Sequence, residues 1–147
     1  MRRIVALVVA LAVLAACGAA GSPSPSTPSS GASPLAGTTW ALQSIGDTRL
    51  PAGVVVTLDL SVDQASGSSG CNQYSGAYST VGSTITFGPL AVTEMACPDA
   101  PMAVESTYLA ALAQVTTWAV PADASMGTEL TLIGPEPASK LVFGPAA

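Results

Sequence analysis

The sequence predicts an α+β domain in residues 35–147, made of a small curved antiparallel β-sheet or partly open barrel and one amphipathic helix. Three observations favour this fold class. Apolar and polar residues alternate over most of the domain, turn residues separate these short segments, and a single segment repeats its apolar residues every three or four positions. One helix among many strands is typical of an α+β domain.

The strand pattern is clearest in Val54–Ser61, where valine and leucine occupy every second position and point toward one face. That alternation is typical of a half-buried strand. The same reasoning predicts seven further short strands, at Thr38–Ser44, Asn72–Ser79, Thr84–Phe87, Leu90–Met95, Thr116–Val120, Glu129–Ile133 and Lys140–Phe143. Val81-Gly82 predicts a hairpin turn, and glycine and proline residues within 134–137 interrupt the chain before the last strand.

The helix is expected after Asp99, because apolar residues there recur at three- and four-residue spacing. These residues are Val104, Tyr108, Ala111, Leu112 and Val115. Asp99 is a candidate N-cap, since its carboxylate can accept a hydrogen bond from the first turn. Pro101 fits the first turn, where its missing N–H costs little. The helix would cover one face or one end of the sheet.

Residues 1–16 have the features of a secretory signal peptide. Arg2 and Arg3 precede an apolar run of eleven residues, Ile4–Leu14. A permanent transmembrane helix needs ~20 apolar residues, so this run is too short to span a bilayer. We therefore expect residues 1–16 to be removed during export.

Cys17 follows the apolar run directly, and the tetrapeptide Leu14-Ala15-Ala16-Cys17 resembles the lipobox of bacterial lipoproteins. This resemblance implies that Cys17 carries lipid such as palmitate and anchors the protein to the exported side of the cell membrane or cell envelope. Several acyl chains, which lipoprotein processing supplies, give stable anchoring. An ordinary signal peptide followed by a chance cysteine is the alternative.

The segment Gly18–Pro34 contains no large apolar residue and is rich in serine and proline. Such a segment cannot bury enough surface to offset the entropy lost on ordering. We interpret residues 17–34 as a lipidated cysteine followed by a disordered tether. The tether is a bare spacer in the simpler interpretation and a glycosylated one in the alternative.

The chain that remains after export is acidic. Nine acidic residues face only two cations, Arg49 and Lys140, which gives residues 17–147 a net charge of −7. A surface of this charge repels nucleic acid and anionic lipid headgroups. We therefore expect no nucleic-acid partner and attachment to the membrane only through the lipid on Cys17.

Two cysteines remain once Cys17 is assigned to lipid. In an exported protein, Cys71 and Cys97 are expected to form a disulfide, and two free buried thiols are the alternative. No metal site or cofactor is expected, since the chain contains no histidine. Met95, Cys97 and Met102 offer soft sulfur ligands for Cu(I), but only if Cys97 is reduced.

Two segments, residues 67–78 and 90–112, together resemble the META domain family, which includes HslJ-like heat-inducible lipoproteins. The matching features are, in order, Gly70-Cys71-Asn72, Tyr74, Gly76, Tyr78, Leu90-Ala91, Thr93, Met95-Ala96-Cys97, Glu105 and Leu109. The resemblance covers essentially all of Leu35–Ala147. It implies a small β-rich domain that is linked to envelope stress and has no established reaction.

These motif residues have a structural interpretation and a functional one. Asn72 can hydrogen-bond exposed backbone where a strand bends, and Thr93 can do the same opposite it. Tyr74 and Tyr78 share one strand face, and packing in the core or at its rim is the simpler interpretation. In the alternative, Asn72, Tyr74 and Tyr78 are binding residues, with the two rings forming an aromatic floor for a small ligand or a peptide.

No catalytic residue is predicted. A nucleophile needs a base within hydrogen-bond reach, and no histidine can serve. Ser68 and Ser69 lack the Gly-x-Ser-x-Gly spacing of a nucleophile elbow. Asp59 and Asp63 on one strand would stand more than ~10 Å apart at ~3.3 Å per residue. We therefore expect a protein that is not an enzyme.

The sequence thus predicts a membrane-anchored envelope lipoprotein with a binding or stress-tolerance role. Two kinds of partner remain open. In one, the sheet opens and a small lipid or amphiphile occupies the barrel interior. In the other, the outer surface contacts another envelope protein, and the interior is filled by aliphatic strand residues together with Trp40, Phe87, Trp118 and Phe143.

Overall fold

The structure is a computed structural model that describes residues 33–120 and 128–146. The predicted signal peptide, the lipidation site at Cys17 and nearly all of the predicted tether lie outside the described residues. Ser33 and Leu35 are already buried, at 8% and 0% exposure. The packed part of the chain therefore includes Ser33, which lies within the predicted tether.

Ten strands form one antiparallel sheet in the described part of the chain. They are β1 (Thr38–Ile45), β2 (Thr48–Arg49), β3 (Thr57–Leu60), β4 (Gln64–Ser68), β5 (Gln73–Val81), β6 (Thr84–Phe87), β7 (Ala91–Val92), β8 (Thr117–Ala119), β9 (Leu130–Ile133) and β10 (Leu141–Pro145). Eight of them close into a ring in the order β1-β3-β4-β5-β6-β8-β9-β10, because β10 pairs back onto β1. β2 pairs with one end of β1, and β7 pairs with β5.

The ring is weakest between β6 and β8, where only Thr84 and Thr117 stand in register. Two backbone bonds flank this pair: Ile85 N–H donates to Thr116 and Trp118 N–H donates to Ser83. By contrast, β1 and β10 pair over most of their lengths despite a bulge between Leu42 and Ser44. The fold is thus the predicted α+β barrel, with one seam held by few bonds.

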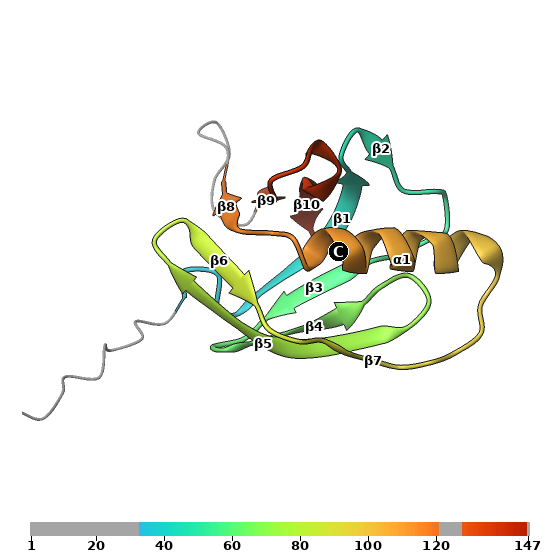
Figure 1. The fold of residues 1–147 in the computed structure, drawn as a ribbon, viewed down its shortest axis with the longest axis horizontal. Coiled ribbons are helices and arrows are strands. Elements are labelled where there is room, and N and C mark those ends of the chain that lie inside the picture. The colour runs from blue at the N-terminus through green and yellow to red at the C-terminus, as the bar shows by residue number, and fades with distance from the viewer. Residues whose placement is uncertain (1–32, 121–127, 147) are drawn as a thin grey trace, which may run out of the picture.

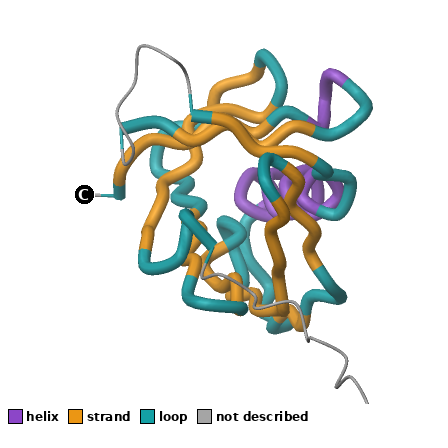
Figure 2. The backbone as a smooth tube through the Cα atoms, turned by 90° about the vertical axis from the view of Figure 1, so that its left-hand side faces the viewer, coloured by secondary structure: helices purple, strands orange, loops and turns teal. Residues whose placement is uncertain are grey.

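The single α-helix, α1 (Asp99–Leu112), lies horizontally across the middle of Figure 1, above β4 and β5 in that view. Figure 2 shows it end-on beside the strands. Tyr108, Ala111 and Leu112 form its buried face. A short 3-10 helix, η1 (Pro137–Ser139), connects β9 to β10 and lies against α1. The helix therefore covers one side of the barrel, as the sequence predicted.

Side chains fill the barrel interior. The largest fully buried ones are Trp40, Tyr108, Phe143, Leu35, Leu58, Leu60, Ile85, Leu112, Leu130, Leu132, Leu141 and Val56. Trp40 and Phe143 are core residues as expected, whereas Phe87 and Trp118 are only partly buried and pack against the core from its edge. An amphiphile inside the barrel would have to displace these side chains. The structure thus favours the filled core over the hollow one.

Several strand boundaries differ from those predicted. Val54–Ser61 was expected to be one strand, but β3 covers only its second half, and Val56 makes an isolated bridge with Ser69. The alternation was nevertheless right, since Val56, Leu58 and Leu60 are all buried. Leu90–Met95 contains only the two-residue strand β7. β2 and β4 were not predicted from the sequence.

The helix begins one residue earlier than expected. Pro98 is the N-cap residue and Asp99 is the first helical residue, so Asp99 does not cap the helix with its side chain. Its carboxylate still lies in the first turn, where negative charge is favourable near the helix N-terminus. Val115 lies beyond the helix, although it is buried as the pattern indicated.

Candidate functional site

A disulfide joins Cys71 to Cys97, which confirms the predicted pairing. It connects the loop between β4 and β5 to the segment just before α1. Gly70, with φ of 109°, allows the sharp turn that brings Cys71 to this position. Closing a loop of 26 residues stabilises the fold by about 3 to 4 kcal/mol in the chain-entropy model.

Asn72 lies next to this disulfide and joins three segments through hydrogen bonds. Its Oδ1 accepts from the backbone N–H of Met95 at 2.6 Å and from the hydroxyl of Thr93 at 2.9 Å. Its Nδ2 donates to Glu105 Oε1 at 2.9 Å. The predicted role of Asn72, to bond exposed backbone at a bend, is therefore what the structure contains.

Glu105 on α1 completes the cluster. Its Oε2 accepts from the backbone N–H of Asn72 at 2.8 Å and from the hydroxyl of Ser69. Burial of this half-buried carboxyl raises its pKa, but the hydrogen bonds from Ser69 and Asn72 outweigh that effect, and the pKa lies below its ordinary value of 4.5. We call Ser69, Asn72, Thr93 and Glu105 the Asn72–Glu105 clamp, because they tie α1 to the sheet.

Tyr74 and Tyr108 are both buried, and their hydroxyl groups are in contact. The Tyr74 hydroxyl donates to the Thr57 carbonyl at 2.8 Å and lies 2.7 Å from the Tyr108 hydroxyl. Since a carbonyl can only accept, the proton between the two tyrosines comes from Tyr108. Burial raises the pKa of both phenols well above 10.0. Tyr78 is buried as well, and its hydroxyl donates to the Ser61 carbonyl at 2.7 Å.

The three predicted binding residues therefore all point into the protein. Asn72, Tyr74 and Tyr78 are exposed by only 4%, 2% and 5%, and each has hydrogen-bond partners within the chain. This placement favours core packing over an aromatic floor for a ligand. Glu105 was not predicted as the partner of Asn72 and Ser69, because no local pattern links positions 33 or 36 residues apart.

The clamp contains a hydroxyl and a carboxylate in contact, the pair that a nucleophile with a general base would need. Ser69, however, is fully buried at 0% exposure, so a substrate cannot reach its oxygen. No group of three or more potential acidic, cysteine or histidine metal ligands occurs among the described residues. The disulfide also removes Cys97 from the Cu(I) ligand set considered with Met95 and Met102.

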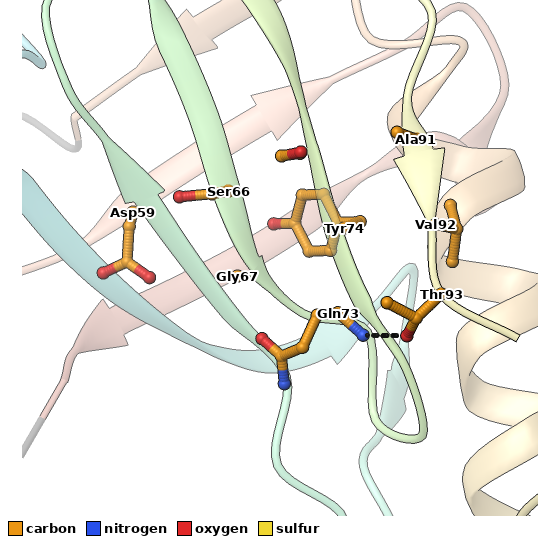
Figure 3. Close-up of a pocket in the computed structure, with 9 residues that line it drawn as sticks. Asp59, Ser66, Gly67, Gln73, Tyr74, Ala91, Val92 and Thr93 are labelled. Carbon is orange, nitrogen blue, oxygen red and sulfur yellow. Dashed lines mark hydrogen bonds between the residues drawn. The ribbon is translucent and has the colours of Figure 1, made fainter. Parts of the chain in front are cut away.

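A shallow concavity lined mostly by polar residues lies over β3, β4, β5 and β7, with a volume of about 420 Å³. Figure 3 shows Asp59, Ser66 and Gln73 along these neighbouring strands, with the Gln73 backbone N–H bonded to Thr93. The clamp residue Thr93 thus forms part of its edge. The concavity is open to solvent and would not enclose a ligand.

A second concavity is larger and mostly apolar. It lies between β2, the first half of α1 and η1 and has a volume of about 590 Å³. We call it the β2–α1 groove. Its lining residues are Ile45, Thr48, Arg49, Leu50, Pro51, Ala100, Ala103, Val104, Thr107 and Ala138. This groove was not predicted from the sequence, since its residues come from three separate segments.

No helix in residues 33–120 and 128–146 is long and apolar enough to cross a bilayer.

The chain is similar to known proteins in sequence and in fold. The model of the META domain family matches residues 33–147. An NMR structure of a protein from Burkholderia xenovorans has 30% sequence identity and a TM-score of 0.64, covering 77% of this chain and 84% of that chain. A second NMR structure has 20% identity and a TM-score of 0.58, covering 74% and 89%, and shows the fold alone. No curated protein matches the sequence.

Proposed function

Because this chain belongs to the META domain family, we propose that it is a lipid-anchored protein of the bacterial cell envelope that acts by binding and not by catalysis. Family membership supports an envelope-associated protein in general terms. The finer assignment draws on the sequence: a signal peptide in residues 1–16 and a lipobox that ends at Cys17. Such a protein would work on the exported side of the membrane. Its binding would contribute to tolerance of envelope stress.

One observation carries the binding role. The apolar side chains of the barrel interior pack against one another, and its polar groups have hydrogen-bond partners within the protein. No buried side-chain nitrogen or oxygen of the described residues lacks a hydrogen-bond partner. Active sites commonly hold polar groups whose partner is the substrate. A filled and satisfied interior instead leaves the outer surface to contact other molecules. The net charge of −7 in residues 17–147 makes nucleic acid an unsuitable partner.

Metabolic labelling with an alkyne fatty acid tests the anchor. We expect the full-length protein, expressed in bacteria, to incorporate the label and to sediment with membranes until detergent is added. Cys17→Ser should abolish the label and release the protein from the membrane fraction. A Cys71→Ser/Cys97→Ser variant is the matched control and should keep the label. Unlabelled wild-type protein would overturn the anchor.

Activity measurements test the second half of the proposal. The purified protein is expected to turn over none of a panel of ester, peptide and glycoside substrates. Turnover that disappears on changing a single serine or acidic residue would contradict a role in binding alone. That result would leave the anchor assignment intact, since labelling of Cys17 is measured independently.

A further inference from the structure

The β2–α1 groove has an aliphatic floor. Ile45, Leu50 and Val104 are partly buried and pack against the hydrophobic core from outside. Three exposed alanines, Ala100, Ala103 and Ala138, form walls without long side chains that would fill the space. A volume of about 590 Å³ falls within the range of ~300–1,000 Å³ that is typical of small-molecule sites.

Arg49 is the one charged residue that lines this groove. It is exposed, and no ion pair joins it to any described residue, although Asp47 stands two positions away. Arg49 is also one of only two cations in residues 17–147, against nine acids. The groove therefore combines apolar surface with an unpaired positive charge on a protein that is acidic elsewhere.

The apolar surface and the unpaired Arg49 together favour a ligand that has one apolar part and one negative charge. A guanidinium forms two parallel hydrogen bonds with a carboxylate. The acidic remainder of the surface disfavours ligands that carry several negative charges. A single carboxylate matches the single cation.

The polar groups of the groove argue for an acyl chain over a peptide. A peptide brings an N–H and a C=O with every residue, and each needs a partner once water is excluded. Apart from Arg49, the side chains that line the groove offer only two hydroxyl groups, those of Thr48 and Thr107. An acyl chain has no polar group beyond its head and makes no such demand.

We propose that the β2–α1 groove binds one free fatty acid, with the acyl chain along Ile45, Leu50 and Val104 and the carboxylate on Arg49. This inference rests on the proposed binding function and names its ligand class. It places the amphiphile outside the barrel, against α1, and leaves the filled interior unchanged.

Titration with laurate tests the proposal. The mature chain, residues 17–147, is used with Cys17→Ser so that no attached acyl chain competes for the groove. Laurate is added below its micelle concentration, and NMR amide shifts and calorimetry report binding. We expect shifts at Thr48–Pro51 and at Ala100–Thr107. Dodecanol should bind roughly tenfold or more weakly, because it lacks the charge-assisted bond to Arg49.

Two matched variants separate the groove from charge in general. Arg49→Gln should weaken laurate binding roughly tenfold or more. Lys140→Gln makes the same change in net charge outside the groove and should leave binding unchanged. Ala103→Trp should fill the groove and abolish binding without unfolding the protein, since Ala103 is exposed; circular dichroism checks its fold.

Four outcomes would overturn the proposal: no laurate binding, equal binding of laurate and dodecanol, equal effects of Arg49→Gln and Lys140→Gln, or tighter binding of a peptide with a free C-terminal carboxylate. None of them affects the envelope assignment. The full-length Arg49→Gln protein should still incorporate label at Cys17 and sediment with membranes, so the two proposals fail separately.

Discussion

Asn72 and Glu105 share two hydrogen bonds, one from the Asn72 side-chain amide at 2.9 Å and one from its backbone N–H at 2.8 Å. These bonds connect the start of β5 with the middle of α1, next to the disulfide between Cys71 and Cys97. The residues that most resemble a functional motif in this sequence thus hold the helix against the barrel. Their contribution is to stability, which makes it measurable by unfolding.

Glu105→Gln should lower the free energy of unfolding by about 1 to 3 kcal/mol. Glutamine keeps the size of the side chain. In the wild-type protein, Asn72 and Ser69 donate to the Glu105 carboxylate, so the NH₂ group of glutamine would meet at least one donor where an acceptor is needed. Urea unfolding followed by tryptophan fluorescence measures the change. Glu94→Gln is the matched control, because Glu94 is exposed. Equal stability of both variants would mean that the clamp contributes nothing net.

The contribution of Glu105 should also depend on pH in the acid range. Its folded-state pKa lies below the ordinary value of 4.5, so between these two values the unfolded chain binds more protons than the folded one. The stabilisation is therefore fully present above 4.5 and is lost as the pH falls through the folded-state pKa. We expect the difference between wild type and Glu105→Gln to shrink below that pH. A pH-independent difference would contradict the lowered pKa.

The clamp illustrates which parts of the structure the sequence could predict. Alternation located the buried side chains of β3 and β5, and three- and four-residue spacing located the buried face of α1. Both are local patterns. The contact of Asn72 with Glu105 joins positions 33 residues apart and depends on how α1 lies across the barrel, which no local pattern specifies.

The missed strand β4 has a different explanation. Gln64–Ser68 contains no large apolar residue, so it lacks the alternation that marks a strand. It still pairs with β3 and β5, and its buried residues, Ala65 and Gly67, are small. The β2–α1 groove was unpredictable for a related reason, since its floor and walls come from three segments that only the fold brings together.

The tyrosine pair predicts unequal effects of two similar substitutions. Tyr108→Phe removes a donor to Tyr74 and leaves the bond from Tyr74 to the Thr57 carbonyl in place. Tyr74→Phe removes both bonds and leaves the buried Tyr108 hydroxyl without its partner, which should cost about 1 to 3 kcal/mol. Unfolding should show Tyr74→Phe as the less stable variant. The double variant should be no less stable than Tyr74→Phe, and a further additive loss would refute the shared bond.

Alkaline pH gives an independent measurement on the same pair. Because burial raises the pKa values of Tyr74 and Tyr108 above 10.0, the unfolded chain loses these protons first and stability falls as the pH rises past that value. Phenolate absorbance from the two residues should therefore appear together with unfolding. Absorbance that appears in the folded protein would show that water reaches the pair.

Gly67 should be the glycine least tolerant of a side chain. A Cβ atom there would stand 2.1 Å from the Thr57 carbonyl oxygen of the neighbouring strand, closer than atoms can approach. Gly82, in the hairpin between β5 and β6, also has a positive φ, of 57°, but nothing lies within 4 Å of its Cβ position. Gly82→Ala therefore measures backbone strain alone, which is about 1 kcal/mol.

Gly67→Ala adds a clash that must separate β3 from β4 and move Thr57, the acceptor for Tyr74. We expect it to be several-fold more destabilising than Gly82→Ala in urea unfolding. Equal losses would mean that the close approach of the two strands relaxes without cost.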